Sequence, residues 1–354
     1  MRIAFDVSPL SHERTGVNNY IRGSLIGLVE AAGGRHEIVC FAPTSPAGAR
    51  TIADALAGLD VELRTRRLPF AHGWRTAWSR LGRPAAERWL GRFDVLHFQQ
   101  WMTPPQRAGL RSTMLHDLVP LRFPEWTTRR TRSMHRLQYA AARGCDVVFV
   151  NSEFTGSDVV ERLGIARERL RVAHPGVDPV FRADGERAEA ERPYVLTVAT
   201  LEPRKNLGTL VAARRLLRDN LSLRIVGGAG WGEQPELDAP GVVRLGRVGD
   251  EELARLYRGA ACVVYPSRFE GFGMPIVEAM ACGAPVVASA HPSMDEAAGD
   301  AAVRAEPESA DAIAAGIREA LARADELRAK GIEHARRFTW RAVGAVFLDA
   351  WETA

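Results

Sequence analysis

Two glutamates, Glu270 and Glu278, form the most chemically informative pattern in this sequence. Glu270 opens the run Glu-Gly-Phe-Gly, in which Gly271 and Gly273 allow the backbone to approach a ligand closely. A carboxylate only accepts hydrogen bonds, so two of them suit paired hydroxyl groups such as those of a ribose or a hexose. Taken alone, Glu270 is better explained as a helix cap and Glu278 as a surface charge. Their combination with the glycine turn favours a ligand site.

The elements around this pair are those of an α/β sheet. Residues 261–265 are a short apolar run typical of a buried strand, and residues 285–289 are a second one. Between them, Pro275 suits the first turn of a helix that continues to Cys282 and ends at Gly283. A strand, a glycine-rich turn and a helix N-terminus together predict a site for an anion or a hydroxyl group.

A second candidate site is the pair Arg204-Lys205. It follows a predicted strand at residues 194–198 and precedes a helix that extends to about Arg218. Two cations at a helix N-terminus oppose the helix dipole, so their placement favours a bound anion. The alternative is that both are exposed surface bases.

The central stretch resembles the signature of the retaining glycosyltransferases of family 4, which have the two-domain GT-B fold. It reads Pro-Ser-x-x-Glu-Gly-Phe-Gly-x-Pro-x-x-Glu-Ala-Met-Ala-x-Gly-x-Pro over residues 266–285. The resemblance implies an α/β protein of the GT-B class, with two facing Rossmann-like domains and a C-terminal helix that crosses back to the first. It extends over essentially the whole chain and is strongest over residues 194–296.

The resemblance also implies roles for the donor-side residues. Arg204 and Lys205 would hold the diphosphate of a nucleotide sugar and stabilise the charge of the leaving group. Glu278 would hold the ribose hydroxyls, and Val248 lies in the segment that would meet the nucleobase. The hexose would be held by Glu270 and by the backbone of Gly271, Phe272 and Gly273.

Two further site residues are predicted nearer the N-terminus. His116 leaves the carboxyl end of a predicted strand, where open α/β sheets bind ligands, although lone histidines are often structural. In the family such a histidine faces the donor sugar, while Asp117 would orient the loop. Gly16 precedes a helix predicted from about Asn18 to Ala31, and the family places a glycine loop here for the diphosphate and the acceptor.

The domain boundaries follow from the order of these elements. Residues 1–182 with the tail 338–354 would form an acceptor-binding domain, and residues 194–337 a nucleotide-sugar-binding domain. Residues 183–193, which are mostly charged residues and alanine, would be the linker. The tail has an apolar stripe at Val343, Phe347 and Trp351 that would pack against the first domain.

Residues 64–92 have a distinct composition, in which arginines alternate with Trp74, Trp78 and Trp89. Trp74, Trp78 and Leu81 fall at helical spacing, so one interpretation is a packed helix with a solvated basic face. Another is a surface for an anionic acceptor or an anionic membrane leaflet, which would place the enzyme at the inner membrane face. Binding of nucleic acid is not expected, because no recognised module accompanies the patch.

Composition sets the broad class. The 354 residues are 46% hydrophobic and 25% charged, with a net charge of +4 and a pI near 9.1, which predicts about two domains of an ordinary globular protein with anionic partners. The four cysteines are scattered, which fits reduced thiols in the cytoplasm. There is no secretory leader, membrane span or metal-ligand cluster in the pattern, so we expect a cytoplasmic enzyme without a metal or other cofactor.

The expected function is transfer of a hexose, with mannose and glucose as the candidates, from a nucleotide-diphosphate sugar to a hydroxyl of a saccharide or lipid-linked acceptor. The resemblance implies retention at the anomeric carbon, and front-face attack by the acceptor is preferred because no enzymic nucleophile is evident. The alternatives are a GT-B-like nucleotide-sugar epimerase and a non-catalytic nucleotide-sugar sensor. A nicotinamide oxidoreductase is disfavoured, because the glycine-rich run at residues 227–232 lacks the helix that a dinucleotide fingerprint requires.

Overall fold

The computed structural model describes residues 1–12, 15–217, 220–230 and 237–354. The chain divides into two compact units. The first unit contains residues 1–122, 128–176 and 339–354, and the second contains residues 123–127 and 177–338.

The first unit is built on one sheet, in which the described residues form seven parallel strands in the order β3-β2-β1-β4-β5-β6-β7. Its central strands are apolar and buried along nearly their whole length, as a sheet covered on both faces requires. The strands are β1 (Arg2–Asp6), β2 (Glu37–Thr44), β3 (Glu62–Arg67), β4 (Val95–Phe98), β5 (Leu110–Leu115), β6 (Val147–Val150) and β7 (Leu170–Val172).

The helices of this unit begin at the polar residues that the sequence supplies. Thr15, Thr128, Ser152 and Thr339 each accept a hydrogen bond from a backbone N–H of the first helical turn. The helices are η1 (Ser8–Ser11), α1 (Gly16–Ala32), α2 (Pro46–Ala55), α3 (Ala71–Leu81), α4 (Glu87–Leu90), α5 (Val119–Arg122), α6 (Arg129–Ala142), α7 (Glu153–Leu163), η3 (Arg167–Arg169) and α14 (Trp340–Thr353).

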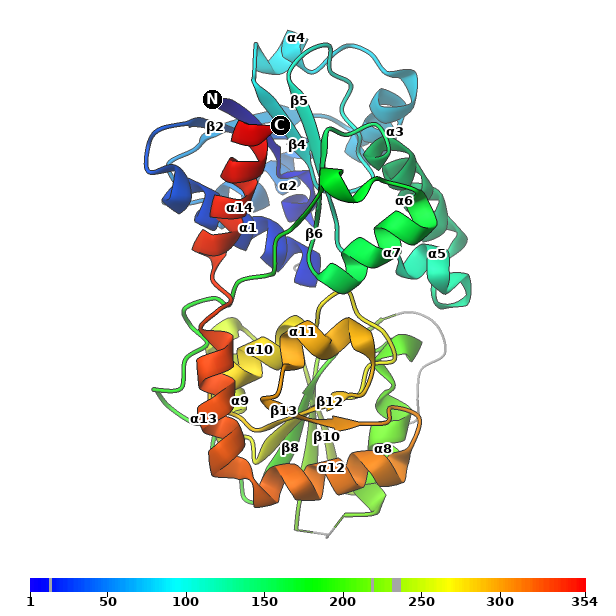
Figure 1. Ribbon diagram of the computed structural model, residues 1–354, viewed down its shortest axis with the longest axis vertical. Coiled ribbons are helices and arrows are strands. Elements are labelled where there is room, and N and C mark those ends of the chain that lie inside the picture. The colour runs from blue at the N-terminus through cyan, green and yellow to red at the C-terminus, as the bar shows by residue number, and fades with distance from the viewer. Residues whose placement is uncertain (13–14, 218–219, 231–236) are drawn as a thin grey trace. The chain divides into compact units, whose positions relative to one another are not determined.

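The C-terminal helix α14 packs along α1 in the first unit (Figure 1). The two backbones approach so closely that a Cβ added to Gly27 would lie 1.7 Å from the carbonyl oxygen of Trp340. A Cβ on Gly344 would lie 2.1 Å from the carbonyl oxygen of Gly27. This contact confirms the expectation that the tail returns to the first Rossmann-like unit.

The second unit has the same architecture on a smaller sheet. Among the described residues six parallel strands follow the order β10-β9-β8-β11-β12-β13. The strands are β8 (Tyr194–Val198), β9 (Ser222–Val226), β10 (Val242–Gly246), β11 (Cys262–Tyr265), β12 (Val286–Ser289) and β13 (Ala302–Ala305). The helices are η2 (Pro124–Trp126), η4 (Pro203–Lys205), α8 (Leu207–Arg215), α9 (Asp250–Gly259), α10 (Met274–Ala281), η5 (Pro292–Met294), α11 (Asp295–Ala298), α12 (Ala310–Ala322) and α13 (Ala324–Ala335).

Each face of the second sheet carries its own hydrophobic core. Helices α8 and α12 contribute to one core, and α9 and α10 contribute to the other. The strand order reverses between β8 and β11, since β9 and β10 extend the sheet on one side and β12 and β13 on the other. Such a reversal separates the loops at the carboxyl ends of the two strands and makes room for a ligand.

The second unit begins before the stretch that the sequence suggested as a linker. The backbone N–H of Val177 already donates to Phe338 O at 3.0 Å. Within residues 183–193, the N–H of Ala188 donates to Arg255 O at 2.9 Å, and the Arg258 side chain donates to Glu186 O. One backbone hydrogen bond and one from a side chain therefore hold this charged segment against the second unit, although its composition alone resembles a linker.

The α1–α14 crossing gives a direct test of packing. Substituting Gly27→Ala should lower the free energy of unfolding by about 1–3 kcal/mol, because the new methyl group forces the two helix backbones apart. Gly73→Ala in α3 is the matched control, since no atom lies within 4 Å of its Cβ position and alanine favours a helix. Urea denaturation followed by circular dichroism measures both, and equal stability of the two variants would contradict the packing argument.

Candidate active site

Hydrogen bonds hold two loops of the second unit together, one after β8 and one after β11. The backbone N–H of Arg268 donates to Arg204 O at 2.8 Å. Asn206, whose φ of 57° lies in the left-handed region, donates through Nδ2 to Pro266 O at 3.2 Å. These bonds fix the Arg-Lys segment against the loop that carries Glu270.

Glu270 lies between the two predicted cations. Its Oε1 is 2.7 Å from Lys205 Nζ, and its Oε2 is 2.6 Å from Arg204 Nη1. Lys205 Nζ also donates to the hydroxyl of Tyr265 at 2.8 Å. The structure thus joins three of the predicted residues in one buried network, with only 9% of the Glu270 side chain exposed.

The same network contains a carboxylate that sequence reasoning did not find. Glu202 is buried, and its Oε1 lies 3.0 Å from Arg204 Nη2. Arg204 Nη1 also donates to the carbonyl oxygen of Phe269 at 3.1 Å. The side chains of Arg204 and Lys205 are only 16% and 10% exposed, which excludes the alternative that both are solvated surface bases.

The electrostatics favour a permanently ionised network. Burial alone would raise the pKa of Glu270, but the charges and hydrogen bonds of Arg204 and Lys205 outweigh burial and lower it to about 2. Burial and the neighbouring Arg204 lower the pKa of Lys205, and Glu270 opposes that shift. At neutral pH Glu270 is therefore a carboxylate held in place by two cations.

The second glutamate of the pair is supported from a different helix. Glu278 is buried within α10 and its Oε2 accepts a hydrogen bond from the hydroxyl of Tyr257, in α9, at 3.2 Å. Helix α10 begins after Gly273, whose φ of 104° lies in a region that residues with a side chain rarely adopt. Gly271 and Phe272 are buried in the same turn.

A third loop, after β12, completes the arrangement. The backbone N–H of Glu270 donates to the Oγ of Ser293 at 3.1 Å. Ser293 and Tyr265 were not identified from the sequence as site residues. The sequence signal that could have indicated them is their position, since each lies at or beyond the carboxyl end of a predicted strand.

The remaining donor-side predictions lie near the β9 and β10 loops. Val248 is half-buried and packs against a hydrophobic core, two residues beyond the end of β10. A Cβ on Gly227 would lie 1.9 Å from Ala199 O, and one on Gly230 would lie 2.0 Å from Leu201 O. These glycines thus permit close packing of two loops, while positions 231–232 of the same run lie outside the described residues.

The two N-terminal predictions, His116 and Gly16, belong to the first unit. The ring of His116 directly follows β5 and meets the ring of Tyr20 edge-on at 5.0 Å. Its Nε2 is buried and has no hydrogen-bond partner among the described residues. Burial, with His135 adding to it and Asp117 opposing it, lowers the pKa of His116 to about 4, so the imidazole is neutral at physiological pH.

Gly16 and Asp117 have simpler surroundings. Gly16 is the first residue of α1 and is exposed, and no atom of the described residues lies within 4 Å of its Cβ position. Packing against the described part of the chain therefore does not require glycine there. Asp117 Oδ1 accepts from the N–H of Val119 at 2.9 Å and so fixes the start of α5, as the sequence suggested for its loop.

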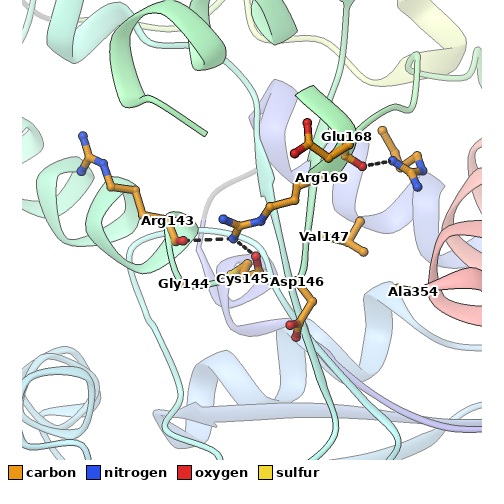
Figure 2. A pocket seen from close by; sticks show the side chains of 9 residues that line it. Arg143, Gly144, Cys145, Asp146, Val147, Glu168, Arg169 and Ala354 are labelled. Carbon is orange, nitrogen blue, oxygen red and sulfur yellow. Dashed lines mark hydrogen bonds between the residues drawn. The ribbon is translucent and has the colours of Figure 1, made fainter. Parts of the chain in front are cut away.

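A hollow elsewhere in the first unit does not contain these residues. Figure 2 shows that it is lined at the start of β6 and β7, which is the amino edge of the sheet. The guanidinium of Arg169 in this hollow donates hydrogen bonds to the carbonyl oxygens of Arg143 and Cys145. Burial raises the pKa of the Cys145 thiol to about 12, so this hollow offers no reactive nucleophile.

Two properties of the described part of the chain bear on cofactors and membranes. Within residues 1–12, 15–217, 220–230 and 237–354, no group of three or more His, Cys, Asp or Glu side chains is placed to hold a metal ion. Over the same residues, none of the helices has the length and apolar character that crossing a bilayer requires.

Comparison with known proteins places this fold and site in a family. Residues 14–181 match the model of Glycosyltransferase Family 4, and residues 182–338 match that of Glycosyl transferases group 1. The chain is 32% identical over 273 residues to O-antigen chain mannosyltransferase B of Escherichia coli, covering 70% of this chain and 71% of that protein. It is 30% identical to the D-inositol 3-phosphate glycosyltransferase of Kribbella flavida, covering 77% and 74%.

Solved structures agree on the fold. Sucrose-phosphate synthase from Thermosynechococcus elongatus superposes with a TM-score of 0.73 at 20% identity, covering 99% of this chain and 98% of that one. Anabaena HepE in complex with UDP and glucose gives a TM-score of 0.72 at 17% identity over the full length of both chains. The fold is therefore that of the GT-B glycosyltransferases. The chain belongs to family 4 of the glycosyltransferases, and its activity is glycosyl transfer.

The buried network predicts a pH dependence of stability. The pKa of Glu270 is lower in the folded state, about 2, than its ordinary value of 4.5, so its stabilising effect is complete above pH 4.5 and is lost as pH falls towards 2. Glu270→Gln should therefore cost the protein stability at pH 7, on the order of 3 kcal/mol, and much less near pH 3.

Urea denaturation of both proteins at a series of pH values measures this difference. Glu308→Gln is the control, because the carboxylate of Glu308 pairs with Arg268 while 58% exposed, and such surface pairs contribute about 1 kcal/mol at most. A Glu270→Gln effect that stayed constant from pH 7 to pH 3 would show that the carboxylate is not held ionised by its neighbours.

Proposed function

We propose that this enzyme transfers a hexose from a nucleotide-diphosphate sugar to a hydroxyl group of a saccharide or lipid-linked acceptor, with retention at the anomeric carbon. The observation that carries the donor assignment is the buried Glu270–Arg204–Lys205 network at the strand reversal of the second unit. HepE, of the same fold, has been solved with UDP-glucose and with UDP, which supports a nucleotide sugar as donor.

Lys205 has a hydrogen-bonding capacity that suits a phosphate. Its ammonium group has three N–H groups, and the described residues take two of them, through Tyr265 and Glu270. The proposed role of the third is to bind a phosphate oxygen of the donor. Arg204, next to it, would add charge against the leaving diphosphate as that charge grows in the transition state.

Under this proposal Glu270 has two tasks. It holds the two cations in position before the donor arrives, and its backbone turn with Gly271, Phe272 and Gly273 would contact the hexose. Glu278 would hold the ribose hydroxyls, and the segment at Val248 would meet the nucleobase. Because Arg204 and Lys205 supply positive charge at the diphosphate, the reaction as proposed needs no metal ion there.

His116 and Gly16 are proposed to act from the first unit. His116 is neutral, and its unpartnered Nε2 could exchange a hydrogen bond with a sugar hydroxyl. Gly16 places no side chain of its own at the N-terminus of α1, which suits approach of the diphosphate or the acceptor. Retention without an enzymic nucleophile is proposed to proceed by front-face attack of the acceptor hydroxyl.

Relatives favour transfer over the other two functions considered from the sequence. Two relatives are a mannosyltransferase and a D-inositol 3-phosphate glycosyltransferase, neither an epimerase nor a sensor. Mannosyl or glucosyl transfer in polysaccharide or glycoconjugate assembly is therefore the proposed process.

The donor is tested first by thermal denaturation against a panel of nucleoside diphosphates and nucleotide sugars. A ligand that binds the native state raises the unfolding midpoint by mass action. One nucleoside diphosphate should raise it more than the others, and Arg204→Ala should abolish that rise. A panel without any shift would contradict the donor assignment.

Transfer itself should depend on the network. Arg204→Ala, Lys205→Ala and Glu270→Ala should each lower kcat by roughly a hundredfold or more, since each removes a preorganised charge or the group that positions it. Lys330→Ala is the control, because Lys330 forms a surface pair with Glu326 on α13. Near-normal turnover of all three site variants would overturn the assignment.

We also propose that the segment 64–92 contacts an anionic membrane at the cytoplasmic face. Its tryptophans serve packing, as one interpretation of the sequence proposed: Trp78 is buried, and the ring of Trp74 packs against it in a tilted arrangement. Leu81, however, is 66% exposed, and Phe70 is 92% exposed. With Gly73 and Ala77 these form an apolar outer face of α3, beside the exposed arginines Arg66, Arg67, Arg80 and Arg83.

An apolar face with a basic rim suits the interface of an anionic bilayer. Phe70→Ser and Leu81→Ser should each weaken binding to phosphatidylglycerol vesicles several-fold, since each removes a side chain that would enter the acyl boundary. Val160→Ser, at an exposed apolar position of α7, should leave it unchanged. Sedimentation with vesicles measures all three, and equal effects would show that Phe70 and Leu81 do not insert.

A further inference from the structure

The inner face of α3 carries a buried cation that the proposed reaction does not yet use. Arg75 is only 4% exposed, and its guanidinium donates through Nε to Ala71 O at 3.4 Å. Its Nη2 lies 3.5 Å from Nε2 of His12. Among the described residues, no carboxylate lies within 4.0 Å of this guanidinium, although a buried charge is costly unless it is paired.

A second arginine repeats this arrangement nearby. Arg130, in α6, directs Nη2 at Nε2 of His72, in α3, at 3.0 Å. The ring of Trp101 lies 4.7 Å from the ring of His72 and 5.8 Å from Cζ of Arg75. Trp101 therefore joins the two arginine–histidine pairs into one cluster within the first unit.

The histidines of this cluster behave as neutral groups. Burial, followed by the charge of Arg75, lowers the pKa of His12, and burial with Arg130, Arg75 and His12 lowers that of His72. A neutral imidazole can accept a hydrogen bond from a guanidinium but cannot balance its charge. Among the described residues, Arg75 and Arg130 therefore contact a neutral histidine each and form no ion pair with a carboxylate.

Asp6, at the end of β1, is the described acid whose charge acts on Arg75. It is fully buried, and its Oδ1 accepts from the N–H of Ser8 at 2.8 Å. Its Oδ2 is buried without a partner among the described residues. Among the described residues, the cluster holds two guanidiniums, and Asp6, whose Oδ2 can still accept a hydrogen bond, is the one carboxylate whose charge acts on Arg75.

We propose that the cluster of Arg75, Arg130, His12 and His72 binds an anionic substituent of the acceptor, either a carboxylate or a phosphate monoester. The anion would lie against the two guanidiniums, and Asp6 Oδ2 would accept from a neighbouring hydroxyl of the same molecule. His12 and Arg130 are exposed, so a ligand can enter from solvent. This inference rests on the proposed function, since only a transferase needs an acceptor.

The test uses full-length protein and two probes, D-glucuronate for the carboxylate and D-mannose 6-phosphate for the phosphate, with D-glucose as the neutral comparison. Isothermal titration measures binding to the wild type and to Arg75→Gln, Arg130→Gln and Arg129→Gln. Arg129 is the matched control, because it is exposed, directly precedes Arg130 in α6 and, among the described residues, forms no hydrogen bond or ion pair with the cluster.

One of the two anions should bind at least tenfold more tightly than glucose, and the stronger of them identifies the substituent. Arg75→Gln and Arg130→Gln should each weaken that binding tenfold or more, while Arg129→Gln leaves it unchanged. Arg130 lies at the surface, so its variant carries the test even where Arg75→Gln fails to fold. Equal losses for Arg129→Gln and Arg130→Gln, or no preference for either anion over glucose, would overturn the proposal.

The same variants separate this inference from the donor assignment. Each should keep the wild-type thermal shift with the preferred nucleoside diphosphate, because that ligand is assigned to the second unit. If the wild-type protein shows no thermal shift with any nucleoside diphosphate, the proposed function is refuted. An intact nucleotide shift without anion binding would refute the acceptor subsite alone.

Discussion

The structure of the second unit depends on one buried electrostatic balance. Glu270 lies within 2.7 Å of both Arg204 Nη1 and Lys205 Nζ, in surroundings where any one of these charges would be costly alone. Because the cations come from the loop after β8 and the carboxylate from the loop after β11, the ion pairs also fix the distance between the loops. A site for a charged ligand is thereby organised before the ligand binds, which is the condition for strong electrostatic stabilisation of a transition state.

The rest of the unit supports this balance through backbone conformations that few residues can adopt. Asn206 takes a left-handed conformation between η4 and α8 and uses its amide to hold the neighbouring loop. Gly273, with a φ of 104°, turns the chain into α10. In the first unit, glycine serves helix packing instead, because Gly27 and Gly344 let the backbones of α1 and α14 come into contact. Close packing therefore contributes more than charge to holding the returning C-terminal helix.

The α3 region shows how one helix can present two different chemistries. Its inner positions Ala71, Arg75 and Trp78 are buried, whereas Phe70, Ala77 and Leu81 lie on the exposed side. The sequence grouped Leu81 with Trp74 and Trp78 by spacing, but the helix ends at Leu81 and leaves that side chain in solvent. The burial of Arg75 could not be predicted either, because an arginine among many arginines gives no signal of which one points inward.

The sequence by itself determined the family and most of the fold. Alternating strands and helices, capping residues and the Glu-Gly-Phe-Gly signature are local patterns, and local conformational preference is enough to read them. Only the tertiary structure decided which charges meet. Glu202 and Tyr265 join the Arg204–Lys205–Glu270 network because β8 and β11 are neighbours in the sheet, although the two strands are far apart in sequence. Pairing across a sheet depends on long-range contacts, which the spacing of residues along one chain does not encode.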